Sequence, residues 1–253
     1  MRICIDPGHG GSDPGAVGNG LKEKDITLAI SLEVDRLLKA RGLSVIMTRY
    51  SDIYVGLNLS RAPISDLSVS IHVNAGGGQG LETWISIFNK TTESKKLGQA
   101  IQDNILKQVD FRSRGLKSKV NSAGNDDYLY MIRKPAGVAV LVECGFIDSA
   151  VDAAILSQSA NLKRVAAGIV NGILQYLGMD TKGAEVDVLA KLKLDTQVDL
   201  PDVKVTLEGT AKEKAVILNV DGKDTTYIPA IILRDIGMTV DWDGTTRTVK
   251  IAK

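Results

Sequence analysis

The stretch Ile3-Cys-Ile-Asp-Pro-Gly-His-Gly-Gly11 governs the interpretation of the whole chain. Its apolar β-forming residues predict a short strand, and the Pro and Gly residues that follow predict an abrupt turn. This turn leaves the imidazole of His9 at the carboxyl end of the strand, between residues with little or no side chain. Because open α/β sheets bind their ligands at that edge, we expect His9 to be presented to a ligand.

The composition is that of an ordinary globular protein, with 253 residues, 44% of them hydrophobic and 24% charged. A formal net charge of +1 is far from the strongly basic balance that is typical of nucleic-acid-binding proteins. No apolar run approaches the roughly 20 residues needed to cross a bilayer. We therefore expect neither a nucleic-acid partner nor a transmembrane segment.

The beginning of the chain bears on where the protein acts. Met1-Arg2 leads directly into the first strand, so we expect no signal peptide. The protein is then made in the cytoplasm and kept there or released by another route, unless the chain is trimmed. Its two cysteines, Cys4 and Cys144, lie in apolar runs and are expected to be buried thiols rather than a disulfide.

The first two thirds of the chain alternate between strand and helix patterns. Strands are expected at 43–48, 67–72, 81–88 and 138–146, and helices from residue 23 or 24 to Gly42 and at 94–109, 151–156 and 162–177. Residues 111–127 are polar and rich in Lys and Arg, which is typical of a solvated loop. This order predicts an α/β domain over residues 1–178, with a mostly parallel sheet flanked by helices.

The last part of the chain has a different pattern. Residues 179–189 lose hydrophobic periodicity and are expected to form a linker. Short strands are then expected at 215–220, 225–228, 239–242 and 246–251, with Asp-Gly turns after the first and third and one helix at 229–236. Residues 190–253 are therefore expected to form a small α+β module.

Both histidines of the chain, His9 and His72, stand at the ends of predicted strands beside glycines. A single histidine in this position is more often structural, but two in the same setting can converge at one edge of a parallel sheet. Glu23 is the expected third ligand; its other interpretation is a carboxylate that stabilises a helix N-terminus. Two histidines and one carboxylate with an open position are typical of a catalytic zinc site, here one per catalytic domain.

Hydrolysis at such a zinc also needs a group that moves a proton. Glu143 fits this role, because a carboxylate near the end of a very apolar strand has its pKa raised by loss of solvent. The alternative is a structural carboxylate paired with a buried Arg or Lys.

Four motifs together resemble the zinc-dependent N-acetylmuramoyl-L-alanine amidases of the type-3 family. They are Asp6-Pro-Gly-His-Gly-Gly11, Glu23-Lys24, Ser70-Ile-His-Val-Asn-Ala75 and Leu141-Val-Glu-Cys-Gly-Phe-Ile147. The resemblance implies His9, Glu23 and His72 as zinc ligands and Glu143 as the catalytic carboxylate. It also implies cleavage of the amide between the lactyl group of muramic acid and L-alanine. Arg133, in a segment similar to one that precedes the family's last strand, is either a substrate or oxyanion contact or a surface arginine.

One segment departs from the family pattern. Arg61-Ala-Pro-Ile-Ser-Asp66 is short and holds a proline, so the helix found there in the family is expected to be truncated. No long insertion is available to cover the zinc, and an open cleft is expected.

The C-terminal module resembles the small domains named after the N-terminal region of copper amine oxidases. The resemblance is carried by Val220-Asp-Gly-Lys223, Tyr227-Ile-Pro229, Leu233-Arg-Asp-Ile-Gly-Met238, Val240-Asp-Trp-Asp243 and Val249-Lys-Ile251. No histidine is present there to bind copper. Tyr227 and Trp242 either stack on sugar, which would target the module to the cell wall, or pack in a small core.

The resulting expectation is a zinc amidase of bacterial peptidoglycan that lyses the cell wall. A phage endolysin released by a separate, holin-like protein is favoured over a bacterial autolysin, and in either case the protein acts at the wall after release. The alternatives are a non-catalytic peptidoglycan-binding protein and another zinc hydrolase such as a carboxypeptidase.

Overall fold

The computed structural model describes residues 1–57, 65–181, 215–220, 223–229, 239–243 and 248–252. The chain divides into two compact units, Met1–Asp187 and Val188–Lys253.

The first unit is built on a six-stranded sheet in the order β4-β1-β5-β8-β6-β7. The strands are β4 (Ser44–Met47), β1 (Arg2–Pro7), β5 (Leu67–Asn74), β8 (Val138–Phe146), β6 (Leu81–Ile85) and β7 (Ser113–Lys117). All neighbouring pairs are parallel except β8 with β6, which is antiparallel. The expected mostly parallel sheet is confirmed.

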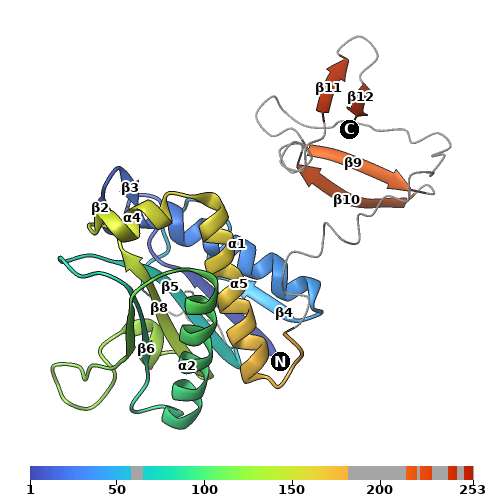
Figure 1. The fold of residues 1–253 in the computed structure, drawn as a ribbon. Helices are drawn as coiled ribbons and strands as arrows, with labels where there is room; N and C mark the ends of the chain where they lie inside the picture. The colour runs from blue at the N-terminus through green and yellow to red at the C-terminus, as the bar shows by residue number, and fades with distance from the viewer. Residues whose placement is uncertain (58–64, 182–214, 221–222, 230–238, 244–247, 253) are drawn as a thin grey trace. The chain divides into compact units, whose positions relative to one another are not determined.

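Three long helices cover one face of this sheet (Figure 1). They are α1 (Glu23–Ala40), α2 (Thr91–Gln108) and α5 (Ser159–Tyr176), and α5 packs against both of the others. The shorter elements are α3 (Tyr130–Arg133), α4 (Ala150–Leu156) and the paired β2 (Val17–Gly18) and β3 (Leu21–Lys22). The sheet is thus flanked by helices as expected.

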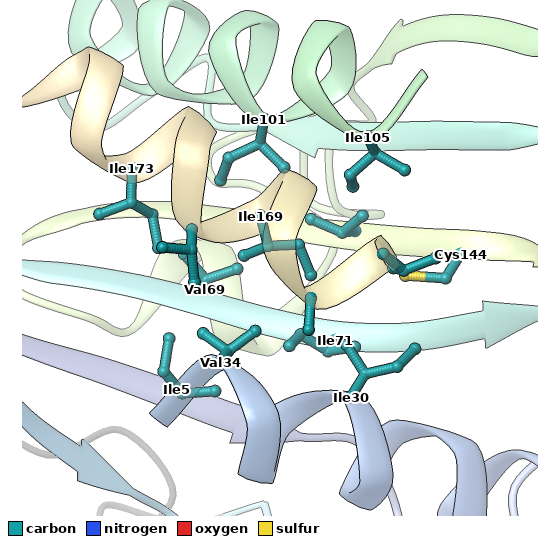
Figure 2. Close-up of a cluster of buried hydrophobic side chains, with 14 of the residues drawn as sticks. Ile5, Ile30, Val34, Val69, Ile71, Ile101, Ile105, Cys144, Ile169 and Ile173 are labelled. Atoms are coloured by element: carbon teal, nitrogen blue, oxygen red, sulfur yellow. The ribbon is translucent and has the colours of Figure 1, made fainter. Parts of the chain in front are cut away.

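The main hydrophobic core lies between the sheet and these helices (Figure 2). Alternate residues of the central strands, such as Val69, Ile71 and Cys144, belong to this core and are fully buried. Successive side chains of a strand point to opposite faces, so His72 and Glu143 point to the face away from the long helices. The apolar alternation therefore decides which face of the sheet carries the polar groups.

One expected loop is partly wrong. Ser113–Lys117, inside the segment interpreted as a solvated loop, forms the edge strand β7. The sequence there is polar and contains Gly115, and the pairing with β6 is irregular between Leu81 and Thr83. Edge strands commonly carry Lys and Arg, which protect them from pairing with other chains, so the charge that indicated a loop also fits an edge.

The second unit contains two antiparallel strand pairs. Strand β9 (Ala215–Val220) pairs with β10 (Lys223–Pro229), and β11 (Thr239–Asp243) pairs with β12 (Thr248–Ala252). The helix expected at 229–236 lies almost wholly outside the described residues, and Pro229 itself belongs to β10. The linker expected at 179–189 and the segment of Arg61 also lie largely or wholly outside them.

Within the described residues, we find no helix that combines the length and the apolar character required to span a membrane.

Candidate metal centre

His9 is held in an unusual backbone conformation just after β1. Its φ is +61°, in the left-handed region that residues with a Cβ rarely adopt. The turn is fixed from both sides: Gly8 N–H donates to the Ile71 carbonyl at 2.9 Å, and the buried Arg49 donates from Nη2 to the Gly8 carbonyl at 3.0 Å. Such strain is maintained by the surrounding structure and is typical of functional positions.

Glu23, the first residue of α1, is buried and links both histidines. Its Oε1 lies 2.9 Å from His72 Nδ1, and its Oε2 lies 3.2 Å from His9 Nε2. The same carboxylate also accepts backbone hydrogen bonds from Ala16 and Val73. Glu23 therefore lies at the N-terminus of α1 and also faces both histidines. Its position is compatible with both interpretations, a metal ligand and a carboxylate that stabilises the helix N-terminus.

The three side chains can meet a single ion. Each offers one ligand atom, and these atoms all lie within 4.8 Å of one another. The separations of 2.9 Å from Glu23 Oε1 to His72 Nδ1 and of 3.2 Å from Glu23 Oε2 to His9 Nε2 place the carboxylate between the two imidazoles. Imidazole nitrogens and carboxylate oxygens are ligand types that zinc binds. The imidazole rings are edge-on, with centroids 5.1 Å apart.

Two glycines make room for this group. A Cβ on Gly8 would lie 2.4 Å from the His72 ring, and one on Gly15 would lie 2.5 Å from Glu23 Oε2 and 2.6 Å from the His9 ring. No side chain can be accommodated at these distances. Gly8 in the first motif and Gly15 in the loop after it thus allow the close packing of the site.

Asp13 contacts the ring nitrogen of His9 that does not face Glu23. Its Oδ2 lies 2.8 Å from His9 Nδ1, and its Oδ1 accepts a hydrogen bond from Gly15 N–H. A carboxylate on one ring nitrogen fixes the imidazole and leaves the other nitrogen for a metal, an arrangement found around most metal-binding histidines. Asp13 is not among the site residues expected from the sequence, although it begins a second Asp-Pro-Gly four residues after His9.

The electrostatics of the group are strongly coupled. The hydrogen bond to Glu23 raises the pKa of His9 to about 9. The pKa of Glu23 is lowered: burial opposes its charge, but the hydrogen bonds from His72 and His9 outweigh that cost. Burial also opposes charge on His72, yet the hydrogen bond to Glu23 raises its pKa. A metal ion binds neutral imidazoles, so an ion at this site would displace the protons of His9 and His72 while Glu23 keeps its negative charge.

Glu143 lies directly across from His72, as its Cα partner in the β5–β8 pair. Its Oε2 is buried and has no hydrogen-bond partner among the described residues. Burial raises the pKa of its carboxyl group to about 7. The alternative interpretation of Glu143 is a structural carboxylate paired with a buried Arg or Lys. Among the described residues, no Arg or Lys forms an ion pair with Glu143.

Arg133 does not share a contact with these residues. Its Nη1 donates to the backbone carbonyls of Tyr128, at 2.7 Å, and Asp127, at 3.3 Å. Its guanidinium also lies over the Tyr130 ring. Within the part of the chain that the structure describes, it is not hydrogen bonded to His9, Glu23, His72 or Glu143 and instead ties down the segment before α3.

The His-Glu-His group at the carboxyl edge of this α/β sheet, with a buried acid beside it, combines the ligand types and the acid that metal-dependent hydrolases use. The comparison with family models makes the class specific: residues 3–175 match the N-acetylmuramoyl-L-alanine amidase family. The chain belongs to this family.

Individual relatives agree with this. The chain is 39% identical over 187 residues to a sporulation-specific N-acetylmuramoyl-L-alanine amidase of Bacillus subtilis, covering 71% of this chain and 69% of that protein. It is 37% identical over 189 residues to an endolysin of Bacillus phage SPP1, covering 71% and 67%. Among solved structures, the catalytic domain of CwlV, an N-acetylmuramoyl-L-alanine amidase of Bacillus (Paenibacillus) polymyxa, matches with a TM-score of 0.62 and 30% identity, over 71% of this chain and 99% of that domain.

Proposed function

We propose that the chain hydrolyses the amide bond between N-acetylmuramic acid and L-alanine in peptidoglycan, with one zinc ion held by His9, Glu23 and His72 and with Glu143 as the catalytic carboxylate. Membership of the amidase family supports the reaction, and the convergence of three suitable ligand atoms supports the metal. The names of the relatives, which include amidases and an endolysin, support a site of action at the bacterial cell wall.

The ligand set favours zinc in a catalytic role. Two imidazoles and one carboxylate leave a coordination position open, whereas structural zinc sites are closed, usually by cysteines. Cys4 and Cys144 are buried free thiols, and neither is among the residues of the group. A zinc ion held by these residues would polarise the scissile carbonyl and lower the pKa of a bound water to about 7.

The observation that carries the mechanism is the unpartnered Glu143 Oε2, buried one strand away from His72. A carboxylate with a pKa of about 7 accepts a proton and returns it with similar ease near neutral pH. In the proposed reaction, Glu143 takes the proton from the attacking water and delivers it to the nitrogen of the departing L-alanine. Glu23 keeps its charge towards the two histidines, and Asp13 holds His9 in place.

Product identification separates this function from the alternatives. Digestion of purified cell walls is expected to yield free L-alanine amino groups without new reducing ends. New reducing ends would indicate a glycosidase, and release of single amino acids from the end of the peptide would indicate a carboxypeptidase. If no product forms, the chain is a peptidoglycan-binding protein.

We further propose that residues 190–253 form a separate module that targets the enzyme to the wall. Support comes from the second compact unit and from its two antiparallel strand pairs. A phage endolysin released by a holin-like protein and a bacterial autolysin both fit this arrangement, since the relatives include an endolysin of a Bacillus phage and an N-acetylmuramoyl-L-alanine amidase of Bacillus subtilis.

A further inference from the structure

A row of polar residues continues across the sheet beyond the candidate metal centre. His72 on β5 is opposite Glu143 on β8, and Glu143 is opposite Glu82 on β6. Residues opposite each other in neighbouring strands project from the same face. On the next strand, β7, Arg114 Nε donates to Glu82 Oε2 at 2.7 Å. The row therefore runs from the histidines through Glu143 to Arg114.

Arg114 contacts both Glu82 and the Phe146 ring, while part of its side chain is exposed. Its side chain is 32% exposed, while that of its partner Glu82 is 4% exposed. Its guanidinium carbon lies 4.8 Å from the centre of the Phe146 ring. Phe146 in turn is fixed against Gly78, where a Cβ would lie 2.3 Å from the ring. The guanidinium is therefore oriented before any ligand arrives.

A purely structural role explains only part of this arrangement. Buried Glu82 needs compensation, and it receives hydrogen bonds from Asn74 Nδ2 at 2.9 Å and Trp84 Nε1 at 3.2 Å as well as from Arg114. Arg114 uses only Nε for this bond. Among the described residues, nothing accepts a hydrogen bond from its two Nη groups. Such a preorganised pair of donors matches the two oxygens of a carboxylate.

The order of the strands indicates which part of the substrate lies there. Glu143 must reach the nitrogen of the departing L-alanine, and it stands between the zinc ligands and Arg114. The peptide stem therefore begins on the Arg114 side. Two strand spacings make about 10 Å, which an extended peptide covers in about three residues. Peptidoglycan stems carry free carboxylates within this distance of the scissile amide.

We propose that Arg114 binds a free carboxylate of the peptide stem and makes the enzyme selective for stems that carry this charge. The inference rests on the proposed amidase function. Glu82 and Phe146 act as positioning residues for the guanidinium, and the glycan occupies the opposite side of Glu143.

The test compares two soluble muramoyl-peptide fragments that differ only in a free or an amidated carboxylate on the second stem residue. The wild-type chain is expected to cleave the free form with kcat/KM about tenfold or more higher, mainly through KM. Arg114→Gln should lose this preference by slowing only the free form. Arg112→Gln, which removes the same charge from an exposed neighbour, should keep it.

Loss of Arg114 leaves Glu82 buried beside fewer donors, so folding needs a control. The double variant Glu82→Gln/Arg114→Gln removes both charges of the pair and should show the same loss of preference with a near-native thermal midpoint. If wild-type enzyme cleaves both fragments equally, or if Arg114→Gln slows both equally, this inference is overturned while the proposed function stands. If wild-type enzyme cleaves neither fragment, the proposed function is overturned and the inference with it.

Discussion

At the scale of single residues, the site combines groups that the sequence indicates with groups that it does not. His9 and His72 are the chain's two histidines, and each lies near the end of an expected strand that is followed by a glycine-rich turn. The sequence therefore predicts that they belong to one site. Glu143 is readable because it interrupts an apolar strand. Asp13 was missed, although a second Asp-Pro-Gly marks its position. Arg49, Glu82 and Arg114 carry no such signal, because their roles depend on contacts between segments that are distant in the sequence.

The distinction between ligand and proton carrier gives the first prediction. Glu143→Gln should keep zinc, because the three ligand atoms remain, but should lower kcat by about 10²–10⁴-fold, the usual contribution of a positioned acid or base. His72→Ala should lose both zinc and turnover. Metal content and kcat measured on the same preparations check this, and zinc loss from the Glu143 variant would show that Glu143 is a ligand instead.

Asp13 gives the second prediction. Asp13→Ala removes the carboxylate 2.8 Å from His9 Nδ1 and should weaken zinc binding about 10- to 100-fold, since this is the usual effect of removing such a partner. Competition with a chromogenic chelator measures the affinity. Asp110→Ala, at an exposed position, is the matched control. Equal affinities for the two variants would refute the positioning role.

At the scale of elements, the strands and helices of the first unit follow the hydrophobic pattern closely. The strand expected at 138–146 has the same bounds as the observed β8. A long apolar run with glycine and turn residues near its ends marks clearly where a strand begins and ends. Strand β7 was not predicted, because a short, polar, irregular edge strand resembles a loop in composition. The turn after β1 was expected, but its strained φ at His9 was not, as it depends on packing against β5 and Arg49.

The turn after β1 can be tested through Gly8. Gly8→Ala places a Cβ 2.4 Å from the His72 ring, so it should displace that ring and lower both zinc content and activity. Gly42→Ala, at a φ of +74° with no atom within 4 Å of the added Cβ, should cost about 1 kcal/mol in the free energy of unfolding and leave zinc binding intact. Metal analysis and thermal unfolding of both variants distinguish the two effects. Full zinc content in Gly8→Ala would contradict the close packing described here.

At the scale of the whole molecule, the chain divides into two compact units, and we propose that they have separate tasks. The matches to known amidases cover about 70% of the chain and almost all of a solved catalytic domain. The sequence predicts this division because its periodicity changes from helix-and-strand alternation to short strands with Asp-Gly turns. What the second unit binds does not follow from such a pattern, because recognition depends on side chains gathered from separate strands.

Deletion of residues 180–253 tests the division of tasks. The truncated chain should still hydrolyse soluble muramoyl-peptide fragments at the full-length rate, since every proposed site residue lies before residue 180. Its retention on cell walls in a pelleting assay should fall by about tenfold or more, because a second binding module adds to the effective affinity. Unchanged pelleting would refute wall targeting by the second unit.

We propose that zinc at His9, Glu23 and His72 makes this chain an amidase, and removal of the metal tests this proposal. Release of L-alanine amino groups from cell walls is measured on the full chain as purified, after treatment with a strong chelator, and after stoichiometric zinc is returned. We predict that the purified chain releases L-alanine amino groups without new reducing ends. Chelation should remove at least about 99% of the rate, because zinc activates the attacking water. One zinc per chain should restore the rate. A rate that survives complete removal of the metal would contradict the account.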